Sequence, residues 1–435
     1  MIMYRKCSTA EADVGMRCYL SGADGTGGRL KATAEDFIVN EISKRPEERS
    51  DGKFIIASIT SRNWETNRLV RILSRTMNIS RERIGFAGTK DKRAVTTQLM
   101  SFEAPDESLA KVDLRDIHIN EAYRSKHGIR IGDLIGNRFE INVTECAMSE
   151  ESIRSTIDSV ASDIKATGGF PNYFGVQRFG TSRPITHLVG EKIIRGDIRG
   201  AVDIYLSKHS DHELPDTAEA RKMLSDRSSL EDAIRIMPKT MSFERTLAEH
   251  LIKHPDDDIG AISKLPPNLQ MMFTHAYQSY LFNMMLSKRM ELGIPLNKPI
   301  EGDVVIPTDA DRVPMHERPI TVTMKNMDLA EKQMRSGKAF LTISLFGAES
   351  EPTTGRMGEI EHTIVNEEKI TNENFIVPGL PNCSSKGSRR EIICPVGDMT
   401  YDIIDGGYKV SFYLSKGNYA TCLLREYMKA DMISY

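Results

Sequence analysis

The chain has 435 residues, of which 40% are hydrophobic and 27% charged, and its formal net charge is −3 at pH 7. These are ordinary values for a globular protein, and a chain of this length usually forms two or three domains. No apolar run approaches the roughly 18–20 residues that cross a bilayer, and Met1–Ala10 lacks the apolar segment of a signal peptide. The composition argues against a disordered chain and a membrane protein, and we expect a cytoplasmic protein.

The first 170 residues alternate between strand and helix patterns. Apolar and polar side chains alternate over 29–42, and 54–60 is a short apolar run, whereas the expected helices carry an apolar face with a 3.6-residue period. Glycines interrupt these patterns where a loop is expected. In chain order, the predicted elements are strands over 29–42 and 54–60, a helix over 67–79, a loop over 85–91, strands over 96–102 and 137–143, and a helix over 149–167.

The character of the sequence changes near residue 200. Residues 203–258 are polar, charged and helical in pattern, and a long methionine-rich helix is predicted over 271–292. Strands and turns rich in proline and glycine are expected from there to about residue 385. A strand over 408–414 and a helix over 419–429 complete the chain. Because strand patterns flank a different middle segment, we expect one domain to be inserted into another.

Basic residues are concentrated in one segment although the net charge is slightly negative. Residues 62–93 contain nine Lys or Arg against three Asp or Glu, and a second basic cluster spans 386–390. Local patches rather than net charge attract phosphates. The alternative is that these arginines only solvate a helix face.

No cofactor or metal motif is evident. The chain lacks a phosphate-binding G-x-x-x-x-G-K-[ST] loop, a dinucleotide fingerprint and a G-x-S-x-G elbow. His250 and His254 have a spacing that can chelate zinc, but no third ligand accompanies them, and surface histidines are the simpler interpretation. Six dispersed cysteines without a C-x-x-C pair predict reduced thiols, with a zinc site from distant cysteines as the alternative.

Two short segments carry the candidate chemistry. Residues 85–98 place Asp91 among Lys90, Lys92 and Arg93 on the predicted loop, and cations favour an ionised carboxylate that can act as a nucleophile. The alternative is a salt-bridged surface turn. Residues 171–180 combine aromatic rings with Asn, Gln and Arg side chains, which can stack on a base and bind its edge. The alternative there is a packed turn.

These two segments resemble the signature motifs of the TruD family of pseudouridine synthases. Ala87–Gln98 is similar to the signature loop of that family, and Asn172–Gly180 is similar to its next hallmark. Four further matches follow in the order of the family: Leu30–Val39, Ile131–Phe139, Ala276–Asn283 and Lys416–Glu426. The length of 203–265 resembles archaeal or eukaryotic members.

The resemblance implies an α+β fold. Its pseudouridine-synthase core has a mixed, mostly antiparallel sheet flanked by helices, formed by residues 1–199 and 386–435, with an inserted α+β TRUD domain over 200–385. The implied activity is isomerisation of uridine to pseudouridine in tRNA, at position 13 of the D-arm. The expected partner is tRNA, with no nucleotide cofactor, no metal and no membrane, and the expected state is a monomer.

The resemblance also assigns roles to residues. Asp91 is the expected nucleophile, attacking either C1′ of the ribose or C6 of the uracil, and Lys31 holds its carboxylate. Asn172 is expected to hydrogen-bond near Asp91 or the uracil, while Phe174 stacks on the base without a hydroxyl to take a proton. The remaining expected substrate contacts are Lys90, Lys92, Arg93, Gln177 and Arg178.

Two other functions stay open. A non-catalytic protein that binds structured RNA would keep the fold, although the presence of Asp91, Lys31 and Asn172 argues against it. A methyltransferase would need a glycine-rich loop after a strand to bind its methyl donor, and the sequence offers none.

Overall fold

The computed structural model describes residues 4–309, 312–351 and 353–435, so Met1–Met3 of the polar N-terminal segment lie outside the described residues. The chain divides into two compact units. We call Ala23–Ser162, Cys394–Ala430 and Ser434–Tyr435 the sheet unit, and Met1–Gly22, Asp163–Ile393 and Asp431–Ile433 the helical unit. The segment 200–385, expected as an insertion, lies within the helical unit, and its exact domain boundaries stay a prediction.

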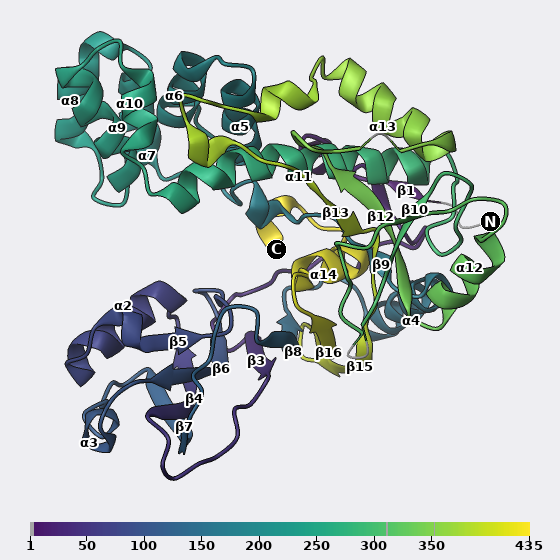
Figure 1. Cartoon of the computed structure of the whole chain (residues 1–435), viewed down its shortest axis with the longest axis horizontal. Coiled ribbons are helices and arrows are strands. Elements are labelled where there is room, and N and C mark those ends of the chain that lie inside the picture. The colour runs from purple at the N-terminus through teal and green to yellow at the C-terminus, as the bar shows by residue number, and fades with distance from the viewer. Residues whose placement is uncertain (1–3, 310–311, 352) are drawn as a thin grey trace. The chain divides into compact units, whose positions relative to one another are not determined.

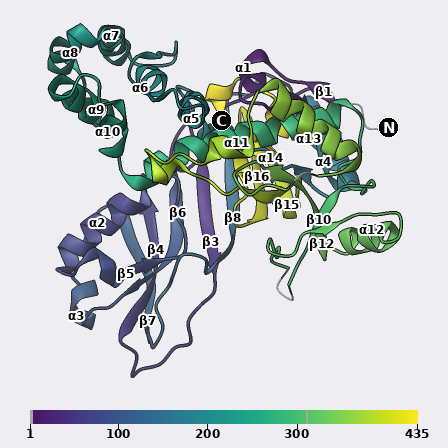
Figure 2. The same ribbon diagram turned by 45° about the horizontal axis from the view of Figure 1, so that its top comes forward.

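The sheet unit is built on an eight-stranded sheet with the order β15-β16-β8-β3-β6-β4-β7, in which β5 also pairs with β6. Only β3 and β6 run parallel, and every other neighbouring pair is antiparallel. Figure 2 shows β4, β6, β3 and β8 side by side. The predicted mixed, mostly antiparallel sheet is therefore confirmed. Its strands are β3 (Phe37–Ser43), β4 (Phe54–Arg62), β5 (Ile84–Phe86), β6 (Val95–Phe102), β7 (Ile117–Ser125), β8 (Leu134–Val143), β15 (Gly397–Ile404) and β16 (Gly407–Ser415).

Helix α2 (Thr66–Met77) covers part of this sheet. Glu65 caps it by accepting hydrogen bonds from the backbone N–H groups of the first turn, and Asn78 ends it in the left-handed conformation. Leu69, Leu73 and neighbouring apolar residues pack against β4 and β6, as the predicted amphipathic pattern requires. The other helices of this unit are α3 (Asp106–Leu109) and α14 (Ala420–Met428), and α4 (Glu150–Thr167) continues into the helical unit.

The strand predicted over 29–42 is shorter than expected, because β3 begins only at Phe37. The carboxylate of Asp36 accepts hydrogen bonds from both the backbone N–H and the hydroxyl of Thr33, at 2.7 and 2.8 Å. Such side-chain contacts to nearby backbone compete with strand pairing. The segment before β3 is therefore a turn, and that turn carries Lys31.

The helical unit consists of a helix-rich part and a small antiparallel sheet (Figure 1). Residues 203–258 are mainly helical, as predicted, and apolar side chains of α5–α11 form one buried cluster. The long predicted helix is α11, which starts at Pro267, a residue suited to a first helical position. The helices of the helical unit are α1 (Thr9–Ala12), α5 (Thr186–Ile194), α6 (Ile198–Ser207), α7 (Pro215–Leu224), α8 (Leu230–Ile236), α9 (Ser242–Lys253), α10 (Asp258–Ser263), α11 (Pro267–Glu291), α12 (Met327–Arg335) and α13 (Gly355–Glu367).

The sequence interpretation missed α12 and α13, where only strands and turns were expected. Gly355 and Gly358 lie in the first turn of α13 without interrupting it, and the buried face of α13 packs against α11. The small sheet has the order β11-β10-β12-β13. The strands of the helical unit are β1 (Arg5–Lys6), β2 (Cys18–Tyr19), β9 (Phe170–Pro171), β10 (Val304–Pro307), β11 (Ile320–Thr321), β12 (Ala339–Leu345) and β13 (Ser388–Glu391), and β14 (Ile393–Cys394) lies at the boundary between the units.

Candidate active site

Asp91 lies on the loop between β5 and β6 of the sheet unit, and its carboxylate is 45% exposed. Lys31 Nζ donates to Asp91 Oδ2 at 3.0 Å, although 60 residues separate them in the sequence. The side chain of Lys31 is 12% exposed, and its Nζ also lies 4.2 Å from the centre of the Phe37 ring. The loop therefore presents an accessible carboxylate beside a cation held from within the protein.

Lys31 has a backbone φ of 57°, in the left-handed region. This conformation costs roughly 1–3 kcal/mol for a residue other than glycine, and it is concentrated at functional sites. Arg93 Nη2 donates to the carbonyl of Ala32 at 3.1 Å, which ties the Asp91 loop to the turn that carries Lys31. The Asp91 loop and the Lys31 turn are therefore joined by two side-chain contacts, one from Lys31 to Asp91 and one from Arg93 to Ala32.

Lys90, the residue before Asp91, anchors the loop. Its ammonium contacts the carboxylate of Glu41 on β3, and these side chains are only 4% and 1% exposed. Its backbone N–H donates to Thr66 Oγ1 at 2.8 Å, at the start of α2. The sequence predicted a substrate-binding role for Lys90, but the structure encloses its ammonium with Glu41, and the substrate-binding role stays a prediction.

Glu41 has further hydrogen-bond donors around it. The Ser43 hydroxyl and the Leu99 backbone N–H donate to Glu41 Oε1 at 2.7 and 3.2 Å. A buried carboxylate is tolerated when it is paired and hydrogen-bonded in this way. The position of Lys90 is consequently fixed by β3, β6 and α2.

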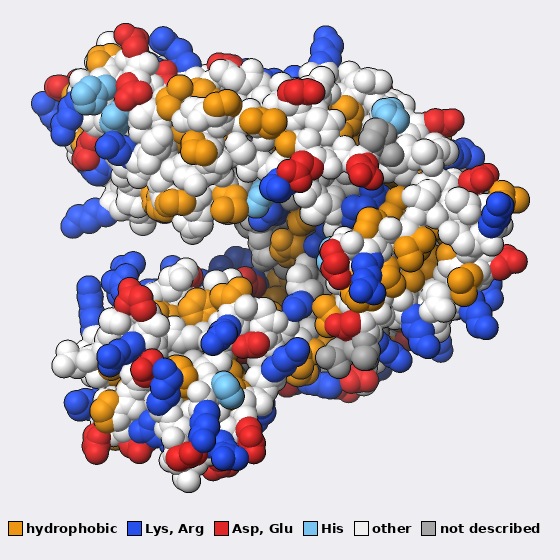
Figure 3. Space-filling model, viewed as in Figure 1, with side chains coloured by type: hydrophobic (Ala, Val, Ile, Leu, Met, Phe, Trp, Pro, Cys, Tyr) orange, Lys and Arg blue, Asp and Glu red, His pale blue; other side chains and the backbone are white. Residues whose placement is uncertain are grey.

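The other Lys and Arg side chains of residues 62–93 are exposed. Lys92 and Arg93 flank Asp91 at the surface, and Arg68, Arg71 and Arg75 share the exposed face of α2. Helix α2 contains no acidic residue. Figure 3 shows Lys and Arg side chains gathered over this part of the sheet unit. A surface of this kind can attract phosphate groups.

The other predicted site residues lie in the helical unit, on the segment after β9. Asn172 is 1% exposed, and its Nδ2 donates to the carbonyl of Glu391 at 3.0 Å. Asn283 on α11 holds the next turn, because it accepts from the N–H of Phe174 and donates to its carbonyl, at 2.9 and 3.0 Å. The Phe174 ring packs edge to face against Phe282, with ring centres 5.5 Å apart.

Arg390 on β13 contacts both Asn172 and Phe174. Its Nη2 donates to Asn172 Oδ1 at 2.7 Å, and its guanidinium carbon lies 4.2 Å from the centre of the Phe174 ring. Arg178 lies 5.6 Å from the same ring centre and donates to Ser279 Oγ, whereas Gln177 is half-buried on the same short helical turn.

His316 and Glu391 form an ion pair beside Arg390, with Nε2 and Oε1 2.8 Å apart. The hydrogen bond to Glu391 raises the pKa of His316. Burial alone would raise the pKa of Glu391, but the contact with His316 helps to lower it below its usual value. The pair therefore favours an ionised carboxylate on β13.

Sequence reasoning missed Glu41, Asn283 and the role of Arg390. Asn283 stands in a matched motif, Arg390 in a noted basic cluster, and Glu41 two residues after the matched segment 30–39. The sequence therefore indicated these three positions, but it did not reveal which residues they contact. The structure collects Lys31, Lys90, Asp91, Lys92 and Arg93 in the sheet unit and Asn172, Phe174, Gln177 and Arg178 in the helical unit.

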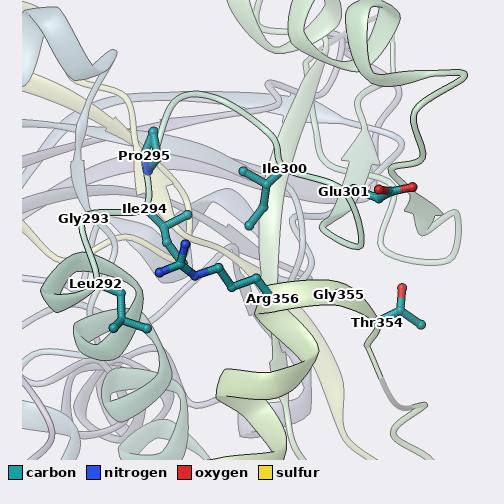
Figure 4. Close-up of a pocket in the computed structure, with 9 residues that line it drawn as sticks. All are labelled: Leu292, Gly293, Ile294, Pro295, Ile300, Glu301, Thr354, Gly355 and Arg356. Carbon is teal, nitrogen blue, oxygen red and sulfur yellow. The ribbon is translucent and has the colours of Figure 1, made fainter.

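A separate pocket of about 670 Å³ lies in the helical unit, lined by nine residues between Leu292 and Arg356 (Figure 4). Arg356 extends from the start of α13 toward the loop that carries Ile294. No predicted site residue lines this pocket. Within the described residues, no cluster of three or more metal-ligating side chains occurs, and no helix is long and apolar enough to cross a membrane.

Comparison with known proteins places these features in one family. A family model described as tRNA pseudouridine synthase D (TruD) matches residues 13–427. A protein named probable tRNA pseudouridine synthase D from Methanococcoides burtonii is 40% identical over 428 residues, which are 97% of each chain. Its namesake from Thermococcus sibiricus is 35% identical over 418 residues, which are 94% of this chain and 97% of the relative.

The fold is similar to a solved structure as well. A crystal structure of a TruD protein from Methanosarcina mazei matches with a TM-score of 0.86 and 37% identity, covering 99% of this chain and 100% of that chain. The fold and these relatives define a pseudouridine synthase, an enzyme class that isomerises uridine in RNA. The chain belongs to the TruD family, which acts on tRNA. The family, fold class and enzyme class predicted from the sequence are confirmed.

Proposed function

We propose that this chain converts uridine to pseudouridine at position 13 of the tRNA D-arm, with Asp91 as the nucleophile. The observation that carries the proposal is the exposed Asp91 carboxylate, which lies 3.0 Å from Lys31 Nζ. Asp91 stands on a loop that the Lys90–Glu41 pair anchors. A nucleophile needs an accessible, ionised carboxylate in a fixed position. The hydrogen bond from Lys31 and the Lys90–Glu41 pair both support a fixed position of this carboxylate.

The reaction breaks the C1′–N1 bond of the nucleotide and forms a C1′–C5 bond. In the proposed sequence, the Asp91 carboxylate forms a transient covalent bond with C1′ or C6, the uracil turns, and C5 takes the place of N1. The C5 proton leaves to a base, and N1 takes up a proton, so no atom is gained or lost overall. Since the Phe174 ring has no hydroxyl group, a different group must accept the C5 proton.

The proposed substrate contacts are of two kinds. Lys92 and Arg93 are exposed beside Asp91 and suit phosphate contacts, as do the arginines of α2. Phe174, Asn172, Gln177 and Arg178 are proposed to bind the uracil and the nucleotides next to it. The target base must leave its stack, at a cost of a few kcal/mol. We propose that the enzyme acts as a cytoplasmic monomer and needs no cofactor.

The test is site mapping on unmodified tRNA. Wild-type protein and the Asp91→Asn variant are incubated with a pool of tRNA transcripts, and pseudouridine is located by carbodiimide labelling and primer extension. We expect a single stop, for position 13, with wild-type protein only. Full turnover by Asp91→Asn would reject the nucleophile, and a stop elsewhere would reject the position.

The same experiment separates the alternative functions. A non-catalytic RNA-binding protein would shift tRNA in a binding assay but leave the uridines unchanged. A methyltransferase would increase the mass of the product RNA, whereas isomerisation leaves the mass unchanged.

A further inference from the structure

We propose that Arg390 is a positioning residue for the pseudouridylation reaction and not a phosphate ligand. In this role Arg390 orients Asn172 and Phe174. This inference rests on the proposed function, because it assumes that these two residues contact the nucleotide. Arg390 belongs to the basic cluster 386–390, so a contact to RNA phosphate is the competing role. The contacts of its guanidinium group decide between the two.

The guanidinium group makes two hydrogen bonds to one residue. Nη2 donates to the side-chain Oδ1 of Asn172 at 2.7 Å, and Nε donates to the backbone carbonyl of the same residue at 3.2 Å. A planar group that binds side chain and backbone together fixes the rotation of the amide. With Nδ2 donating to the Glu391 carbonyl, both ends of the Asn172 amide are held by β13.

The same group also orients Phe174. The guanidinium carbon lies 4.2 Å from the centre of the Phe174 ring, within the range of cation–π contacts. Phe282 contacts that ring edge to face, and Asn283 fixes the backbone of Phe174. The ring therefore has a polar neighbour from β13 and an apolar neighbour from α11, which together define its plane.

The strand that carries Arg390 is itself fixed. Residue 390 pairs with Ile343 on β12, and the preceding Arg389 binds Thr342 Oγ1 at 2.9 Å. Since successive strand residues point to opposite faces, Arg389 and Arg390 serve different sides of β13. Arg389 secures the strand within the small sheet, and Arg390 is held in place over Asn172 and Phe174.

The test compares Arg390→Gln and Arg390→Lys with wild type, using single-turnover rates on unmodified tRNA and tRNA affinity at several salt concentrations. We expect Arg390→Gln to lower the saturating rate on the order of 100-fold, because misplacing a positioning group by about 1 Å has that effect. Arg390→Lys keeps the charge but loses the planar fork, and it should stay at least about 10-fold below wild type. Affinity should change less than about 3-fold.

A double-mutant cycle identifies the partner. If Arg390 acts in part through Asn172, the rate loss of Arg390→Gln combined with Asn172→Ala should be clearly smaller than the product of the two single losses. Multiplying rate losses would overturn the inference. Arg235→Gln on α8, which removes an exposed arginine from the same unit, is the matched control and should keep the wild-type rate.

The competing role gives a different result. A phosphate ligand would weaken binding, reduce the slope of log K against log salt by about 1, and leave the saturating rate unchanged. That pattern would overturn the inference, as would a wild-type rate for Arg390→Lys. If Arg390→Gln does not fold, the rate of Arg390→Lys decides. An inactive wild-type protein would instead reject the proposed function.

Discussion

Lys90 and Asp91 are consecutive residues, yet their side chains occupy opposite environments. The ammonium of Lys90 is enclosed with Glu41, whereas the carboxylate of Asp91 is exposed and contacts Lys31. The buried pair holds the loop from one side, and the exposed carboxylate faces solvent on the other. Two neighbouring residues of one short loop thus differ in role, since Lys90 anchors the loop and Asp91 is the proposed nucleophile.

Removing the cation beside Asp91 should reduce turnover without unfolding the protein. We expect Lys31→Met to lower the single-turnover rate about 100-fold, because the carboxylate loses the group that fixes its position. tRNA affinity should change little. Unchanged turnover would show that Lys31 is dispensable. Arg235→Gln, which removes a surface cation far along the chain, is the control.

Breaking the buried pair should destabilise the sheet unit. Glu41→Gln leaves the Lys90 ammonium buried without its counterion, so we expect the free energy of unfolding to fall by about 3–5 kcal/mol. Urea unfolding followed by circular dichroism measures this change. The double variant Glu41→Gln/Lys90→Met should recover part of the loss, because no unpaired charge remains. Equal stability of single variant and wild type would contradict the anchoring role.

The arginines of α2 should contribute to the salt dependence of tRNA binding. Arg71 and Arg75 are exposed and share one face of the helix. If each contacts a phosphate, Arg71→Gln/Arg75→Gln should reduce the slope of log K against log salt by about 2, with little effect on the saturating rate. Filter binding between low and moderate salt measures the slope. An unchanged slope would remove α2 from the RNA contact surface.

His187 makes the stability of the helical unit depend on pH. Its ring packs between Phe179 and Tyr280, and burial, with a smaller effect of the Lys208 charge, lowers its pKa from 6.5 to about 4. The unfolded chain binds this proton more tightly, so stability is complete above pH 6.5 and falls as the pH drops to about 4.

The expected loss from His187 is about 3 kcal/mol across that window. Other groups titrate in the same range, so the measurement is the difference between wild type and His187→Phe, which keeps an aromatic ring at this position. The variant should show a weaker fall in unfolding free energy between pH 6.5 and 4. Parallel pH profiles would contradict a buried neutral histidine.

Much of the secondary structure could be predicted from the sequence. The helix predicted over 149–167 is α4, that over 67–79 is α2, and the final helix is α14, each within a few residues. Such patterns depend on neighbours three or four residues away, which the sequence displays directly. The strand expected from residue 29 was too long, because Asp36 forms a local turn that apolar alternation does not reveal.

The sequence by itself determined the family, through ordered motifs, and nominated Asp91 as the reactive carboxylate. Only the tertiary structure decided that Lys90 is enclosed while Asp91 is exposed, and that Arg390 contacts Asn172 and Phe174. Lys90 and its partner Glu41 are 49 residues apart in the sequence, and Arg390 and Asn172 are 218 residues apart. Local patterns set which elements form, whereas burial and pairing of charges depend on which strands the folded sheets bring together.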